Sequence, residues 1–221
     1  VSVANAGCSS GTSSFTLTIN PLPTITSSAT ATTKCFSSSY QNGTLAFSAT
    51  SNSPTNYSIV WDAAALGAGL TNVTNAVLSG SPLIFPIPAG TAAATYNGTL
   101  TVANSNGCIS TSNAFTQQIA PLPTITSSST ANAICFSSSS QNSYLSYSAT
   151  TGSPTLYSIT WNAAALAAGL TNLTYTTITA SPLNIPVAAN VAAGTYTGSV
   201  TVTNGTCPST GNSFTITINP L

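Results

Sequence analysis

Apolar and polar residues alternate with a period of two along much of the chain. In the segment that begins at Tyr96, the side chains of Tyr96, Leu100 and Val102 fall on one face, and asparagine and threonine fall on the other. The segments FTLTIN from Phe15 and FTITIN from Phe214 alternate in the same way. Clusters of Gly, Pro, Asn and Ser separate such segments about every 8–12 residues. The pattern predicts an all-β protein of antiparallel β-sandwiches.

Two segments depart from this alternation. Asp62–Gly69 and Asn162–Gly169 are rich in alanine, begin with a residue that caps helix N-termini and end on glycine. Each predicts one short helix.

The chain repeats itself at an offset of about 100 residues. TITSSATATTKCF at Thr24 returns as TITSSSTANAICF at Thr124, and SPTNYSIVW at Ser53 returns as SPTLYSITW at Ser153. A partial third copy opens the chain. We therefore divide the sequence into the C-terminal strands of a preceding repeat (residues 1–23), β-sandwich repeat 1 (residues 24–123) and β-sandwich repeat 2 (residues 124–221).

The first segment, Val1–Pro23, matches the C-terminal strands of a repeat. The part of a repeat that precedes these strands, here called the body, has no copy before it in this sequence. Either the sequence is a window of a longer tandem array, or this segment completes a neighbouring molecule by strand donation. The window is favoured, because neither body in this chain lacks its own ending. The motif PLPT recurs at Pro21 and Pro121, and its first residues reappear at Pro220. Proline fixes φ and removes an amide donor, so the junctions are stiff, which predicts a rod of domains.

The amino-acid composition excludes several classes of function. Charged residues make up 1% of the chain: one base, Lys34, one acid, Asp62, and no histidine. This excludes paired-carboxylate and histidine-dependent catalysis and the basic stripe that nucleic acids require. We expect no enzyme, no cofactor, no metal site and no nucleic-acid partner, with Lys34 in solvent and Asp62 as a helix cap. The most apolar stretch, near Trp61–Leu70, is too short for a membrane span, which needs about 20 residues.

A family resemblance rests on three runs of repeat 2. These are SPTLYSITWNAAALAAGLTNLT, SPLNIPVAANVAAGTYTGSVTVTNGTC and FTITINPL, and repeat 1 carries their counterparts. They resemble the PKD-like, immunoglobulin-like repeats of large secreted surface proteins in Bacteroidetes-type bacteria. The resemblance implies tandem immunoglobulin-like β-sandwiches, export, and display on the bacterial cell surface. Members of that family are richer in Asp, Glu and Lys than this chain.

Cysteine placement agrees with an oxidising compartment. Cys35 and Cys108 of repeat 1 match Cys135 and Cys207 of repeat 2, which predicts the disulfides Cys35–Cys108 and Cys135–Cys207. Two alternatives remain open: Cys8–Cys35 with Cys108–Cys135, which would join neighbours across the proline junction, or free buried thiols. Cys8 belongs to the partial repeat, so we expect its partner upstream of Val1.

Four aromatic residues have both structural and functional interpretations. Trp61 and Trp161 could stack on carbohydrate, but their alternating surroundings favour the core. Tyr96 and Tyr196 enter a strand after a turn, which favours the structural role called a tyrosine corner.

The surface offers candidate sites for glycans. N-glycosylation sequons begin at Asn42, Asn56, Asn72, Asn97, Asn172 and Asn204. Their number does not exceed chance for this composition. Serine and threonine are abundant, and glycans on their hydroxyls would keep an uncharged surface solvated, because few charges are present to do so.

Two functional hypotheses follow. The first is a structural repeat unit of a bacterial extracellular filament, fibre or surface stalk, whose partners are identical repeats or protomers and attached glycans. The alternative is an adhesin segment that binds carbohydrate or a surface polymer. The segments LTNVTNAVLSGSP and LTNLTYTTITASP differ only mildly between the repeats, which favours structure over recognition.

Overall fold

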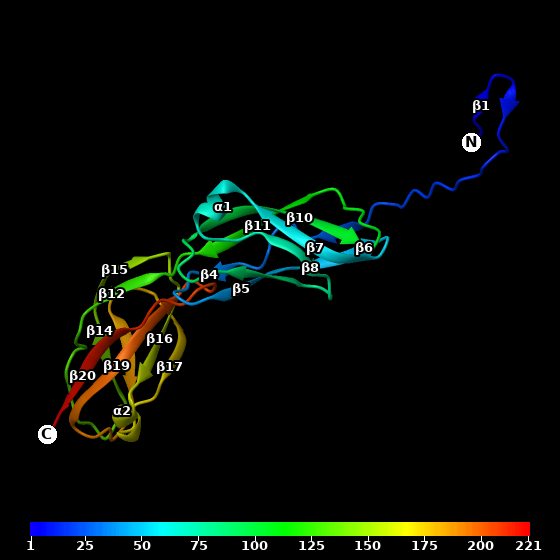
Figure 1. The fold of residues 1–221 in the computed structure, drawn as a ribbon. Coiled ribbons are helices and arrows are strands. Elements are labelled where there is room, and N and C mark those ends of the chain that lie inside the picture. The colour runs from blue at the N-terminus through cyan, green and yellow to red at the C-terminus, as the bar shows by residue number, and fades with distance from the viewer. The chain divides into compact units, whose positions relative to one another are not determined.

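The computed structural model describes the whole chain, residues 1–221, apart from the side chain of Ser9. The chain is built almost entirely of β-strands arranged as tandem β-sandwiches (Figure 1). The predicted all-β fold class is therefore confirmed. The boundaries that we drew at residues 23 and 123 stay predictions.

Repeat 1 forms two layers. One is a five-stranded sheet in the order β4-β11-β10-β7-β8, and the other consists of the pairs β3-β6 and β5-β9. The strands are β3 (Thr24–Ser27), β4 (Lys34–Cys35), β5 (Gln41–Leu45), β6 (Phe47–Ser51), β7 (Pro54–Trp61), β8 (Val73–Val77), β9 (Leu83–Ile87), β10 (Ala94–Asn104) and β11 (Asn113–Ala120).

Repeat 2 follows the same plan. Its five-stranded sheet has the order β13-β20-β19-β16-β17, and the pairs β12-β15 and β14-β18 form the second layer. The strands are β12 (Thr124–Ser127), β13 (Ile134–Cys135), β14 (Gln141–Leu145), β15 (Tyr147–Thr151), β16 (Leu156–Trp161), β17 (Leu173–Thr177), β18 (Leu183–Val187), β19 (Gly194–Thr203) and β20 (Asn212–Asn219).

Both predicted helices are present as single turns, α1 (Ala63–Gly67) and α2 (Ala163–Ala167). The carboxylate of Asp62 accepts a hydrogen bond from the amide of Ala65 at 2.8 Å. The amide oxygen of Asn162 accepts one from the amide of Ala165 at the same distance. The predicted caps are confirmed, because each side chain satisfies an amide that the first turn leaves without a partner.

Strand direction differs from the prediction at one edge of each sheet. β4 pairs with β11, and β13 pairs with β20, in parallel rather than antiparallel orientation. The segment that carries β3 and β4 contributes first to the two-stranded pair and then to the five-stranded sheet. Since it crosses between layers without a hairpin turn, it meets the last strand running in the same direction. Alternation along a strand carries no information on this direction.

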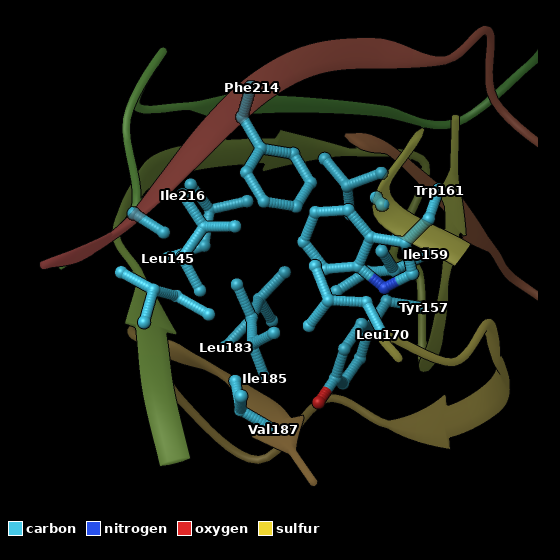
Figure 2. Packing of buried hydrophobic residues seen from close by; sticks show 14 of the residues in the cluster. Leu145, Tyr157, Ile159, Trp161, Leu170, Leu183, Ile185, Val187, Phe214 and Ile216 are labelled. Atoms are coloured by element: carbon cyan, nitrogen blue, oxygen red, sulfur yellow. The ribbon is translucent and has the colours of Figure 1, made fainter. Parts of the chain in front are cut away.

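The core of repeat 2 includes Trp161, which packs with aliphatic side chains of the buried cluster (Figure 2). The ring centroids of Trp161 and Phe214 are 5.3 Å apart, in an edge-to-face arrangement. Trp61 of repeat 1 packs in the same way against Phe85 and Phe115. Trp61 is 3% exposed and Trp161 is 4% exposed, so both are core residues, as predicted, and neither is a carbohydrate platform.

A tyrosine corner is present in repeat 2. The hydroxyl of Tyr196 donates a hydrogen bond to the carbonyl oxygen of Ala192, four residues upstream, at 2.8 Å. Tyr96, its counterpart in repeat 1, is buried.

The partial repeat does not form the strand that its alternation predicts. Residues 4–9 form the small hairpin of β1 (Ala4–Asn5) and β2 (Cys8–Ser9), and the described backbone of residues 10–23 has no strand. Phe15, Leu17 and Ile19 are 74%, 75% and 85% exposed. The prediction of a strand at FTLTIN is wrong for this chain, because neighbouring strands are needed to complete a ladder and cover an apolar face.

Among the differences between the two cores is a pair of facing residues on neighbouring strands. A Cβ atom on Gly43 of β5 would overlap the ring of Phe85 on β9. At the equivalent positions repeat 2 has Ser143 and Ile185, which lie opposite each other in the ladder. The hydroxyl of Ser143 is buried and donates to the carbonyl oxygen of Asn132 at 2.6 Å. A larger residue on one strand is therefore matched by a smaller one on its neighbour.

This pairing predicts coupled effects on stability. Gly43→Ser should destabilise the protein by about 1–3 kcal/mol, since the new side chain overpacks the core against the ring. Adding Phe85→Ile should restore much of that loss, with a coupling energy of about 0.5–3 kcal/mol. Urea unfolding of the two single variants and the double variant measures the cycle. Additive losses would show that the two positions do not compensate each other.

Candidate functional site

The structure contains a disulfide between Cys35 and Cys207, 172 positions apart, with an S–S distance of 2.07 Å and a Cα–Cα distance of 5.7 Å. By sequence, Cys35 belongs to repeat 1 and Cys207 to repeat 2. The predicted pairing of Cys35 with Cys108 and of Cys135 with Cys207 is therefore wrong. The alternative pairing, Cys8 with Cys35 and Cys108 with Cys135, is also wrong.

The length of the last strand explains why the two cysteines of one repeat do not bond each other. Cys108 lies in the turn that precedes β11, whereas Cys35 lies opposite Ala120, the last residue of β11. An eight-residue strand spans about 26 Å at about 3.3 Å per residue, far beyond the reach of a disulfide. The same argument separates Cys207, which precedes β20, from Cys135, which lies opposite Asn219 at the end of β20. Matching positions in the sequence could not show that the two cysteines of one repeat lie at opposite ends of a strand.

Both ends of the disulfide fall in the same compact unit of the fold. The chain clusters into one unit of residues Val1–Thr32, Asn42–Ile87 and Tyr96–Gln117, and a second unit of residues Thr33–Gln41, Pro88–Thr95 and Gln118–Leu221. The second unit thus contains repeat 2 together with three segments that belong to repeat 1 by sequence: residues 33–41, 88–95 and 118–123. The Cys35–Cys207 bond therefore links two segments of this unit covalently.

The backbone presents Cys35 and Cys135 in the same way. The amide of Phe36 donates to the carbonyl oxygen of Ala120, and the amide of Phe136 donates to that of Asn219, both at 2.8 Å. The side-chain amides of Gln41 and Gln141 donate to the carbonyl oxygens of the two cysteines, also at 2.8 Å. The scaffold that holds the bonded Cys35 is therefore repeated around the unbonded Cys135.

Within the described residues, Cys8, Cys108 and Cys135 carry no disulfide. Cys8 and Cys135 are exposed, and Cys108 is half-buried. The Sγ atom of Cys108 lies 3.9 Å from the carbonyl oxygen of Asn20, in the segment that precedes the first proline junction.

The three side chains with shifted pKa values all form hydrogen bonds within the fold. The backbone amide of Ala65 and the side-chain amide of Asn97 donate hydrogen bonds to Asp62 and hold its pKa below the usual range. Burial raises the pKa of Tyr57 and of Tyr157, although each hydroxyl donates to a backbone carbonyl oxygen at 2.7 Å. Lys34 lies half-buried on β4. No cluster of three or more His, Cys, Asp or Glu side chains occurs among the described residues.

The sequon asparagines are exposed, except Asn56, which is half-buried. Several also have structural roles: the amide oxygens of Asn72 and Asn172 accept hydrogen bonds from the backbone amides of Trp61 and Trp161, at 2.9 Å and 2.8 Å. N-glycosylation at Asn42, Asn56, Asn72, Asn97, Asn172 and Asn204 stays a prediction.

A surface groove of about 400 Å³ lies on repeat 2, beside Leu156, Tyr175 and Thr201–Thr203. Tyr175 is 71% exposed. Repeat 1 has asparagines, Asn56 and Asn75, in place of Leu156 and Tyr175. The two repeats thus differ in surface chemistry at this position.

In the described chain, neither helix has the length or the apolar character needed to cross a membrane.

Comparison with known proteins identifies the fold. No protein-family profile and no curated protein matches the chain. Among solved structures, the FN1–FN3 domains of chicken CNTN1 match with a TM-score of 0.50 and 12% identity, over 90% of this chain and 66% of that one. The fibronectin(III)-like modules of Clostridium thermocellum CbhA match with a TM-score of 0.44 and 15% identity, over 90% of this chain and 95% of that one. The chain has tandem β-sandwiches of the immunoglobulin and fibronectin III type.

The disulfide connectivity predicts an asymmetric effect of cysteine substitution. Cys207→Ser should lower the free energy of unfolding by up to about 5 kcal/mol, because the bond closes a long loop and restricts the unfolded chain. Cys108→Ser, the matched substitution in repeat 1, should leave stability nearly unchanged. Urea unfolding under non-reducing conditions tests both. A loss of stability in Cys108→Ser equal to that in Cys207→Ser would contradict the connectivity.

The helix caps predict a pH dependence that differs between the repeats. Because the folded-state pKa of Asp62 is lowered, its contribution to stability is present above the ordinary carboxyl pKa of about 4 and is lost as the pH falls through the folded-state value. The melting temperature should therefore fall slightly at acidic pH. Asp62→Asn, which reproduces the cap of repeat 2, should remove this dependence, and Asn162→Asp should add a second one. Thermal unfolding between pH 2 and pH 7 measures it, and an unchanged pH profile in Asp62→Asn would rule out the cap as its source.

Proposed function

We propose that this chain is a structural repeat unit of a bacterial extracellular filament, fibre or surface stalk, built from PKD-like repeats. The observation that carries the proposal is the Cys35–Cys207 bond, which joins a segment of one repeat to the next. As the sequence divides the chain, the backbone at Pro121–Pro123 and this disulfide both join residues of repeat 1 to repeat 2, and the disulfide lies within one compact unit. A second covalent connection is useful where a chain of domains transmits force outside the cell.

The partners in this proposal are identical repeats. Almost no charge is present to repel a neighbouring copy, since the chain has one base and one acid and a net charge of zero. Hydroxyl and amide groups of Thr, Ser and Asn dominate the outward strand positions, and they can form neutral hydrogen bonds with a copy of the same surface. Glycans on this surface would supply the solvation that charge provides in other proteins.

An oxidising location supports export. Structural disulfides persist outside the cytosol, and the Cys35–Cys207 bond is of this kind. Display on a bacterial cell surface is part of the proposal and rests on the resemblance of the repeats to secreted surface proteins.

An adhesin segment that binds carbohydrate is the second candidate. It rests on the groove beside Tyr175, where an exposed aromatic ring adjoins threonine hydroxyls. Aromatic rings and hydroxyls are suited to sugar binding, but the groove chemistry is not shared by repeat 1. The structural role is favoured because it uses features that both repeats have.

The proposal predicts a periodic polymer whose assembly is insensitive to salt. Electron microscopy of the native material should show fibres with a regular repeat, and these should persist from low to high ionic strength, because few ion pairs exist to be screened. Fibres that dissociate between the two conditions would contradict the proposed interface. So would a chain of these two repeats that stays monomeric at high concentration without glycans, and dispersed monomers that bind a sugar would favour the adhesin.

A further inference from the structure

The segment Thr12–Asn20, here called the N-terminal strand segment, has the composition of a buried strand. Phe15, Leu17 and Ile19 are largely exposed, while their counterparts in repeat 2 are at most 1% exposed (Phe214, Ile216 and Ile218). FTLTIN and FTITIN differ only by an exchange of Leu for Ile. The N-terminal strand segment therefore carries the apolar face that β20 buries, without a sandwich to bury it in.

The position of β20 shows what this segment needs. β20 lies between β13 and β19 in the five-stranded sheet, and β11 lies between β4 and β10. Figure 2 shows Phe214 and Ile216 pointing from this strand into the core. A segment of the same sequence is thus complementary to a sandwich body that supplies both flanking strands and lacks its own last strand.

Register places a cysteine of that body at a defined point. In both repeats of this chain the body cysteine lies opposite the last residue of the final strand, Cys35 opposite Ala120 and Cys135 opposite Asn219. The equivalent last residue of the N-terminal strand segment is Asn20, and Pro-Leu follows all three. A body seated on this segment would bring its cysteine opposite Asn20.

A thiol is already in place beside Asn20. The Sγ atom of Cys108 lies 3.9 Å from the carbonyl oxygen of Asn20. Cys108 is the repeat 1 counterpart of Cys207, and Cys207 bonds the body cysteine of the repeat before it. The exposed strand segment, the register of the body cysteine and the position of the Cys108 thiol therefore all indicate the same partner, a further repeat body.

We propose that the N-terminal strand segment forms the last strand in the sandwich of a further repeat body of this type, and that the body cysteine of that repeat bonds Cys108. By the same rule, Cys135 bonds the counterpart of Cys207 in a following repeat. This inference rests on the proposed function and names the partner of its polymer. Every junction then carries one disulfide, which joins the body cysteine of one repeat to the cysteine that precedes the last strand of the next repeat.

Bond formation requires an oxidant, which a small-molecule disulfide such as oxidised glutathione supplies. The thiolate of Cys108 attacks this disulfide and releases one glutathione thiolate, which takes up a proton. The thiolate of the body cysteine then attacks the Cys108 sulfur of the mixed disulfide and releases the second glutathione. Two protein thiols are oxidised to one disulfide, and one glutathione disulfide is reduced to two thiols.

Disulfide mapping of the native polymer tests the proposal. Free thiols are blocked with iodoacetamide under denaturing conditions without reduction, and the digested material is searched by mass spectrometry for linked peptides. We expect the Cys108 peptide linked to a peptide with a body cysteine other than Cys35, and no alkylated Cys108. Alkylated Cys108, or a Cys108–Cys135 bond in a species of single-chain mass, would overturn the proposal. Periodic fibres with alkylated Cys108 would refute the junction bond and leave the structural function standing.

A mixing experiment tests the strand itself. The acceptor is the full chain with Phe214→Ser, Ile216→Ser and Cys108→Ser, which weakens β20 and keeps Cys135; the donor is the unmodified chain. In a glutathione redox buffer we expect a covalent dimer linked through donor Cys108 and acceptor Cys135. Donor Phe15→Ser/Ile19→Ser should reduce its yield at least tenfold, and donor Thr16→Ser/Thr18→Ser, the matched control, should not. Equal yields from both donors would overturn the strand insertion, and if the acceptor does not fold, the native disulfide map decides.

Discussion

The last strand of each sandwich needs a neighbour on both sides, and the organisation of this chain depends on that requirement. β11 and β20 are internal strands of their sheets, so each contributes ladder hydrogen bonds in two directions and a row of buried side chains to the core, which is apolar in β20 and includes Gln117 in β11. Each also leads directly into a proline junction. The strand that closes one core therefore fixes the point at which the next repeat starts. Phe15–Asn20 has a similar sequence but pairs with no strand of the described chain, and it has no strand structure.

The ends of this strand also determine the sulfur chemistry. A strand of eight residues holds the two cysteines of one repeat far apart, so neither can bond the other. Cys35 instead bonds Cys207, and Cys108 and Cys135 are unbonded in the described chain. The hydrogen bonds that Gln41 and Phe36 make around Cys35 are reproduced by Gln141 and Phe136 around Cys135. The observed disulfide thus joins Cys35, which belongs to repeat 1 by sequence, to Cys207 of repeat 2, and both lie within one compact unit of the fold.

Much of the fold could be predicted from the sequence because its signals are local. Alternation identified the strands, the Asp62 and Asn162 caps identified the helices, and the position of Trp161 in an alternating run identified a core residue. The parallel pairing of β4 and the partner of Cys35 could not be predicted in this way. Both depend on where a segment arrives after crossing between layers, which is a property of topology. Strand length and strand register must be combined to show which cysteines lie close enough to form a disulfide.

Neighbouring repeats with nearly the same sequence face a problem during folding, since strands can pair with the wrong repeat and trap the chain. The facing positions on β5 and β9 oppose this error. β14 with Ser143 would collide with Phe85 if it paired with β9, whereas β5 with Gly43 would leave a cavity against Ile185 of β18. Each wrong combination is penalised, one by overlap and the other by lost packing. The difference at this pair of facing positions thus disfavours the pairing of either strand with the other repeat.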